Sequence, residues 1–359
     1  MKLGLQLGYW GAGPIENCAD LFAEAEHSGF DAVFTAEGYG SDAYTSLAWY
    51  GCATERVRLG TAVAQMSARP PTSAAMHALS LDHLTNGRHI LGIGVSGPQT
   101  VEGWYGQPFG QPLARTREYV QVIRDVLARE KPVTNSGPHY PLPYPATAVG
   151  SSGLGKPLKS ITHPLRKDLP IWLGAEGPKN IALAAEIADG WLALYLTLGM
   201  ADEYATWLAD GFARPGARLR REEFEVAATV QVVVTDDTAK AIDDYRPIVG
   251  FYIGGMGAAT RNFHADVYRR MGYGDVVDEV SALFLEGQQW EAIGRVPDEM
   301  VRETMIVGSA DQVRDEFALW ERAGVDMLMV TARDTQTITQ LGELVNQEPS
   351  SIESAVHVS

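Results

Sequence analysis

The sequence feature that most constrains the fold is a repeated alternation of short apolar runs with longer amphipathic segments. The amphipathic segments carry apolar residues three and four positions apart, which is the spacing of a helix. The expected strands run over residues 3–8, 32–37, 58–64, 89–95, 170–175, 191–196, 226–234 and 327–331. Strands that alternate with helices pair in parallel through right-handed crossovers. Eight such units predict a closed (β/α)8 TIM barrel, with a doubly wound open sheet as the alternative.

One long segment, residues 131–169, interrupts this alternation. It is rich in proline and glycine and shows no helical or strand period, so we expect an irregular insertion after strand four that acts as a lid or pocket wall. Elsewhere the pattern predicts that Pro14 opens a helix, and that Ser309 and Gln312 form a capping box. We therefore expect one domain over residues 1–347, with the insertion at about 131–169 and a disordered tail over 348–359.

Composition excludes several classes of protein. The 359 residues carry 29 Lys and Arg against 45 Asp and Glu, a net charge of −16, which argues against general binding of nucleic acid. Two cysteines, Cys18 and Cys52, are too few for a disulfide framework. No apolar run is long enough to span a membrane, and the first residues do not resemble a signal peptide, so we expect a cytoplasmic protein.

The residues themselves point to the carboxyl ends of the strands as the site, because that is where barrel enzymes carry their chemistry. Glycine-rich turns follow strands four and five, at 94–97 and 174–177, and their backbone N–H groups could bind an anion such as phosphate. Ordinary strand-to-helix turns are the alternative reading. Glu37 ends strand two and is a candidate acid or base, or else a paired surface carboxylate. The eight histidines form no metal-binding motif, so no metal is expected.

Three runs carry a resemblance to a known family: 92–98 (GIGVSGP), 59–63 (LGTAV) and 174–178 (GAEGP). In this order they resemble the bacterial luciferase-like superfamily. The chain is most similar to the branch that uses the deazaflavin coenzyme F420, including methylenetetrahydromethanopterin reductase and F420-dependent glucose-6-phosphate dehydrogenase. Three short motifs resemble those of an uncharacterised actinobacterial group of this branch: 35–37 (TAE), 41–45 (SDAYT) and 103–106 (GWYG).

The resemblance implies a TIM barrel, commonly dimeric, that acts as an F420-dependent oxidoreductase on a small organic substrate. It implies a cis peptide between Ala62 and Val63, where the bulge bends the deazaflavin ring, with Gln65 beside the ring. It also implies that two turns hold the ribityl-phosphate side of the cofactor. Their residues are Val95, Ser96, Gly97, Ala175, Glu176 and Gly177.

The acid–base residues depart from the family pattern. Several family members carry Asp-His where this chain has Ala36-Glu37, and the family glutamate of strand one is here Gln6, which cannot titrate. We therefore expect Glu37 to be the catalytic proton partner, since burial raises the pKa of a carboxyl group. Two other functions stay open. One is an FMN-dependent monooxygenase fed by a separate reductase, and the other is a non-catalytic flavin or deazaflavin carrier.

Overall fold

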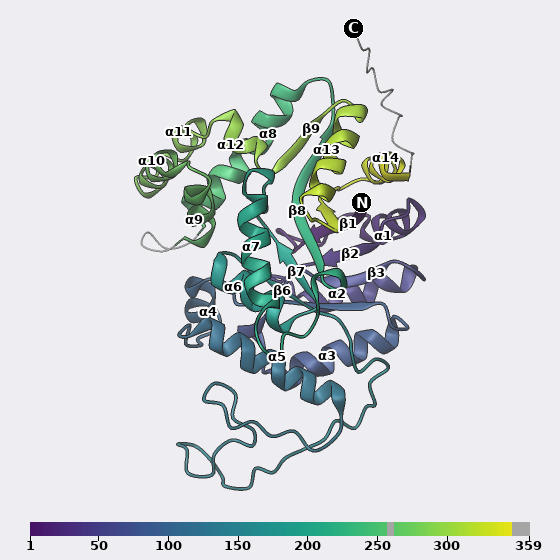
Figure 1. The fold of residues 1–359 in the computed structure, drawn as a ribbon, viewed down its shortest axis with the longest axis vertical. Helices are drawn as coiled ribbons and strands as arrows, with labels where there is room; N and C mark the ends of the chain where they lie inside the picture. Colours follow the sequence, from purple (N-terminus) through teal and green to yellow (C-terminus); the bar gives the residue numbers. More distant parts are fainter. Residues whose placement is uncertain (257–261, 347–359) are drawn as a thin grey trace.

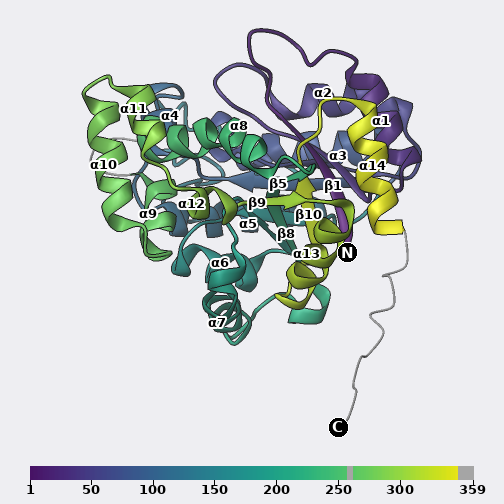
Figure 2. The same cartoon turned by 90° about the horizontal axis from the view of Figure 1, so that it is seen from above.

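The computed structural model describes residues 1–256 and 262–346, and its centre is a closed parallel barrel (Figures 1 and 2). Its strands are β1 (Lys2–Gly8), β2 (Ala32–Thr35), β3 (Arg58–Thr61), β5 (His89–Gly94), β6 (Ile171–Gly174), β7 (Gly190–Ala193), β8 (Glu225–Val234) and β10 (Met327–Val330). The sheet closes because β10 pairs in parallel with both β8 and β1. The predicted TIM barrel is confirmed, and the open-sheet alternative is wrong.

The barrel interior is packed with side chains, as in other barrels of this size. Phe34 of β2 and Trp172 of β6 fill it, with ring centroids 5.9 Å apart. Gly60 of β3 leaves room for Phe34, because a Cβ atom there would lie 2.3 Å from the Phe34 ring. A second core lies between the strands and the surrounding helices. Most strand residues on both faces are therefore buried, which is why the strands read as apolar runs rather than as alternating patterns.

Helices surround the barrel and connect its strands. They are α1 (Cys18–His27), α2 (Ala43–Tyr50), α3 (Pro71–Leu84), α5 (Pro112–Ala128), α6 (Pro178–Ile187), α7 (Ala201–Phe212), α13 (Ala310–Arg322) and α14 (Thr335–Asn346). The capping box of α13 is confirmed, with Ser309 N–H donating to Gln312 Oε1 at 2.8 Å. The expected helix start at Pro14 is wrong. Helix α1 begins at Cys18, after Asn17 takes a left-handed conformation.

Several short elements differ from the expected pattern. The third expected strand, 58–64, stops at Thr61 and resumes as β4 (Ala64–Gln65), and the Ala62–Val63 peptide between the two is cis. A short helix, α4 (Pro98–Gly103), follows β5. Strand β9 (Met305–Gly308) pairs only with the far end of β8, so it extends the sheet outside the closed ring.

A group of helices lies beside the barrel between β8 and β9 (Figure 1). It comprises α8 (Thr238–Gly250), the π-helical turn η5 (Phe251–Gly255), α9 (Phe263–Arg270), α10 (Gly274–Leu285), α11 (Gln289–Gly294) and α12 (Asp298–Arg302). The group has its own core, which includes Ile253, Tyr268 and Met300 and reaches Tyr195 beyond β7. This contact places the group against the carboxyl ends of the strands.

The insertion at 131–169 is irregular, as expected, apart from bridges at Val133–Leu158 and Asn135–Leu142. Glu118 of α5 anchors it by accepting a hydrogen bond from the Tyr140 N–H at 2.6 Å. Figure 1 shows its loops beside α3 and α5. The segment thus covers the outside of α5, which differs from the expected lid.

Two further expectations concern the chain as a whole. None of the helices in residues 1–256 and 262–346 is long and apolar enough to cross a bilayer. The expected disordered tail, 348–359, lies outside the described residues. The single-domain organisation stays a prediction.

Candidate functional site

The carboxyl ends of the barrel strands meet at one rim, which we call the barrel mouth. Glu37 follows β2, Gln65 ends β4, and the turns 95–97 and 175–177 follow β5 and β6. Neighbouring strands bring these positions together, since Gln65 pairs with Gly94 and Gly94 pairs with Gly174. The structure therefore gathers the sequence-predicted site residues at one rim of the barrel.

Val63 lies against the strands next to it. A Cβ atom on Gly94 would come within 2.7 Å of Val63 Cγ2, and one on Gly174 within 2.9 Å of Val63 Cγ1. Two of the mouth glycines are therefore explained by the side chain of Val63. The sequence had suggested that the turns beginning at these glycines bind an anion.

Glu37 is almost fully enclosed, with 8% of its surface exposed. Arg69 Nη1 donates to its Oε2 at 2.9 Å, and the backbone N–H of Gln65 donates to the same oxygen at 2.7 Å. Arg69 Nη2 donates to Oε1. A carboxylate with this set of charged and neutral donors is stabilised in its ionised form.

Arg69 is a functional candidate that the sequence reasoning missed. It lies 4.8 Å over the ring of Tyr44, and its carbonyl accepts a hydrogen bond from the Tyr119 hydroxyl at 3.1 Å. Burial disfavours its charge, but the hydrogen bond to Glu37 and the surrounding charges outweigh burial, so the pKa of Arg69 is raised. The available signal was a single arginine in the loop directly after the third barrel strand.

Two glutamine side chains at the mouth present unsatisfied acceptors. Gln6 Nε2 donates to the Ala62 carbonyl at 3.2 Å, and Gln65 Nε2 donates to the Glu37 carbonyl at 2.9 Å. The Oε1 atom of each is buried and has no hydrogen-bond partner in the described part of the chain. Buried acceptors are rarely left unpaired in proteins. This pair fits the ring N–H donors of a bound heterocycle such as a flavin or deazaflavin.

The turns after β5 and β6 provide a second type of binding surface. Ser96 and Gly177 have φ angles of 59° and 77°, which turn the backbone sharply before α4 and α6. Gly177 precedes Pro178, the first residue of the ten-residue helix α6. The N–H groups in the first turn of such a helix favour an anion, which fits the phosphate of a cofactor.

Glu176 has a partner that the sequence did not reveal. Its Oε1 lies 3.0 Å from Nδ1 of His264, which comes from α9 in the neighbouring helical group. The His264 ring packs against Tyr195 and Tyr252, with centroids 5.4 Å and 5.2 Å away. The Glu176 carboxylate therefore already contacts His264, and any contact of Glu176 with the cofactor has to be made alongside this one.

Exposed aromatic rings complete the mouth on the side of β1, β2 and β5. Tyr39 and Trp104 are 62% and 63% exposed, and their ring centroids lie 6.4 Å apart. Tyr9 is half exposed and lies against Gly38. Large exposed aromatic rings beside a site are suited to bind a flat or apolar ligand.

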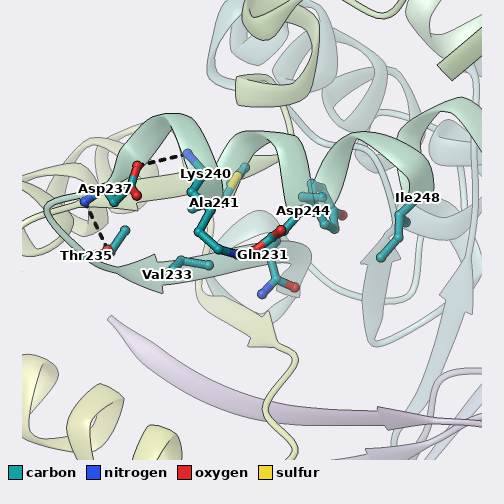
Figure 3. A pocket seen from close by; sticks show the side chains of 10 residues that line it. Gln231, Val233, Thr235, Asp237, Lys240, Ala241, Asp244 and Ile248 are labelled. Atoms are coloured by element: carbon teal, nitrogen blue, oxygen red, sulfur yellow. Dashed lines mark hydrogen bonds and ion pairs between the residues drawn. The ribbon is translucent and has the colours of Figure 1, made fainter. Parts of the chain in front are cut away.

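A cavity of about 320 Å³ lies elsewhere, between β8 and α8 (Figure 3). Gln231, Val233, Lys240 and Asp244 are among the residues that line it, and none of the sequence-predicted site residues does. Lys240 and Asp244 already pair with each other at 2.5 Å. This cavity is therefore separate from the mouth. Within the described ranges, no cluster of three or more His, Cys, Asp or Glu residues could hold a metal ion.

Comparisons with known proteins agree with this architecture. The model of the luciferase-like monooxygenase family matches residues 4–327. A protein of Mycobacterium tuberculosis whose name proposes a coenzyme F420-dependent oxidoreductase is 62% identical over 345 residues, covering 96% of this chain and 99% of the relative.

Two solved structures show the same fold. One is the coenzyme F420-dependent tetrahydromethanopterin reductase of Methanopyrus kandleri, at TM-score 0.78 and 23% identity over 95% of this chain and 97% of that one. The other is the oxygenating constituent of a Pseudomonas putida diketocamphane monooxygenase in complex with FMN. It has a TM-score of 0.65 at 18% identity, over 97% of each chain.

Proposed function

Since this chain belongs to the luciferase-like monooxygenase family, we propose that it is a coenzyme F420-dependent oxidoreductase that acts on a small organic substrate. The observation that carries this proposal is the 62% identity, over nearly the whole of both chains, to the relative with the F420-dependent name. The two unsatisfied glutamine acceptors at the mouth support it, because they suit a planar heterocycle with N–H donors.

The residues around the mouth divide naturally between the two ends of such a cofactor. Ala62, Val63 and Gln65 would contact the ring. The turns 95–97 and 175–177 would hold the ribityl-phosphate part, with the first turn of α6 directed at the phosphate. When bound, coenzyme F420 supplies a hydride through carbon 5 of its deazaflavin ring. The chain supplies orientation, exclusion of water and control of the proton.

Glu37 stays our proposed catalytic residue, as a fixed negative charge of the barrel mouth. Arg69 and the Gln65 N–H stabilise its ionised form. A carboxylate stabilised in this way accepts a proton poorly, so we propose that Glu37 orients the substrate rather than exchanging the proton.

An FMN-dependent monooxygenase is the second candidate, favoured by the structural likeness to the FMN-bound oxygenating enzyme. The unpaired acceptors of Gln6 and Gln65 do not distinguish F420 from FMN, because flavin and deazaflavin rings both carry a ring N–H. The two functions differ in the electron acceptor, which is an organic compound for F420 and oxygen for FMN. The F420 function predicts anaerobic oxidation of reduced F420 by an organic acceptor, without oxygen uptake. Oxygen consumption with reduced FMN, and no reaction with reduced F420, would instead show the monooxygenase.

A homodimer and a cytoplasmic location are further proposals that follow from the family resemblance and from the composition. Sedimentation of the purified protein measures the first. A third possibility, a non-catalytic carrier, would bind the cofactor tightly and show no turnover with any acceptor tested.

A further inference from the structure

Reduction of a substrate by hydride requires a proton donor beside the reacting atoms. The two positions where the family resemblance places acid–base residues do not provide one here. Gln6 has no titratable proton, and Glu37 is held as an ion pair by Arg69. Among the described residues, His264 is the histidine whose ring contacts the strand-end residues of the barrel mouth.

The contact between His264 and Glu176 brings an imidazole and a carboxylate together from two separate parts of the chain. Nδ1 lies 3.0 Å from Glu176 Oε1, and the two side chains are 23% and 20% exposed. The carboxylate is off the axis of the Nδ1–H bond, and neither Nδ1 nor Glu176 Oε2 has an aligned hydrogen bond within the described ranges. Since Nδ1 faces Glu176, Nε2 on the opposite edge of the ring is directed away from the carboxylate.

Two tyrosine rings pack against the imidazole of His264. Tyr195, after β7, and Tyr252, in η5, meet the ring nearly edge to face. Burial raises the pKa of Tyr252 to about 12, and burial together with neighbouring tyrosines raises the pKa of Tyr195. Both phenols are therefore neutral near neutral pH. On the same helix, Asp266 is paired with Arg269 at 3.9 Å.

We propose that His264 is the proton-transferring catalytic residue of this barrel mouth and that Glu176 is its positioning residue. A carboxylate beside one ring nitrogen fixes the tautomer and orientation of an imidazole, and leaves the other nitrogen free to exchange a proton. This inference rests on the proposed F420-dependent function. It assigns the substrate to the carbonyl compounds, including conjugated ketones, because their reduction places negative charge on oxygen.

The step balances as follows for a ketone. A hydride with its two electrons adds to the carbonyl carbon, a C–H bond forms, and the C=O π bond breaks. The oxygen would take a proton from Nε2 of His264, giving an alcohol. Reduced F420 would supply the hydride as the two-electron reductant and would release one proton to solvent. His264 regains its proton from solvent. In the reverse direction the same nitrogen accepts the proton.

The test compares His264→Gln and Glu176→Gln with His27→Gln, a control on the exposed end of α1. The probes are cyclohexanone and 2-cyclohexen-1-one, mixed anaerobically with protein that carries reduced F420. We expect His264→Gln to lower the single-turnover rate at least about 100-fold, with the dissociation constant of F420, measured by fluorescence, within about threefold of wild type. His264→Ala should regain rate when imidazole is added. Together with the melting temperature, this rescue shows that the variant is folded.

The role of Glu176 is tested by the pH dependence of the rate, because a positioning residue acts through the imidazole. We expect the wild-type rate of ketone reduction to depend on pH. Glu176→Gln should change this dependence, and His264→Gln should abolish it. A purely structural Glu176 would change stability and leave the shape of the pH profile unaltered.

Three results would overturn the inference. The first is a rate for His264→Gln within about threefold of wild type. The second is a dissociation constant for F420 raised tenfold with the rate at saturating F420 unchanged, which would make His264 a cofactor contact. The third is wild-type protein that binds F420 but reduces neither ketone, which removes the substrate class and leaves the F420 function standing. Failure of the wild-type protein to bind F420 would instead defeat the proposed function.

Discussion

Arg69 holds the carboxylate of Glu37 with both terminal nitrogens of its guanidinium, across the ends of β2 and β4. The side chains are 13% and 4% exposed, so neither charge is well solvated. The pair turns the expected acid–base residue of the mouth into a fixed anion. It also makes Arg69 as important to the site as Glu37.

Removing Arg69 alone should destabilise the protein more than removing both charges. Arg69→Met leaves a buried carboxylate unpaired, which typically costs about 3–5 kcal/mol. The double variant Arg69→Met with Glu37→Gln should recover most of this loss. Urea unfolding measures the free energies. A double variant no more stable than Arg69→Met would show that the ion pair does not explain the effect.

Glu37→Gln should lower turnover while leaving the affinity for F420 within a few fold. The substitution keeps the shape of the side chain but removes the negative charge that faces the substrate. Affinity is expected to persist because Glu37 reaches the cofactor region through Gln65 and Arg69 rather than through the phosphate turns. Steady-state rates in the oxidative direction, with F420 and a secondary alcohol, provide the measurement. Unchanged rates would remove Glu37 from the reaction.

Gly94→Ala should disturb the mouth through Val63. The new methyl group would lie 2.7 Å from Val63 Cγ2, and overpacking of this kind typically costs about 1–3 kcal/mol. Combining it with Val63→Ala should restore part of the stability. Gly13→Ala is the matched control, because nothing lies within 4 Å of its added Cβ atom. Equal melting temperatures for Gly94→Ala and Gly13→Ala would contradict the packing shown here.

His89 should make the stability of the fold depend on pH. The ring is fully buried at the start of β5, its Nδ1 lies 2.9 Å from the Leu59 carbonyl oxygen, and burial lowers its pKa from 6.5 to about 4. The unfolded chain therefore binds this proton below about pH 6.5, whereas the folded chain does not until about pH 4. Stability should fall as the pH drops through this window, by on the order of 3 kcal/mol.

Urea unfolding between pH 4 and pH 7.5 measures this loss. His89→Asn, which keeps a donor near Leu59, should flatten the dependence, whereas His27→Asn on the surface should not. A wild-type profile that matches that of His89→Asn would exclude this source of pH sensitivity.

The barrel was predictable because its strands are buried on both faces. Runs such as 90–94 and 327–330 contain no polar side chain, and helical periods separate them. Strand β9 escaped prediction because three apolar residues followed by a glycine carry little signal, and its pairing with the outer end of β8 is a tertiary property. The start of α1 was misplaced because Pro14 suits a first helical turn, yet residues 9–17 form a loop instead.

The site was predictable only where it follows the strand ends. Glu37 and the two glycine turns could be placed at the mouth from strand order alone. Arg69 and His264 could not, because each reaches the mouth through contacts between residues far apart in the sequence. An apolar period shows that 263–270 is a helix. It does not show that one histidine of this helix meets Glu176.

The central claim is that this mouth holds a deazaflavin, and competition between F420 and FMN for the purified protein tests it most directly. Fluorescence titration should give a dissociation constant for F420 at least about tenfold lower than that for FMN, and Gln6→Leu and Gln65→Leu should each weaken F420 binding because they remove an acceptor. Tighter binding of FMN than of F420, or binding of neither, would contradict the account.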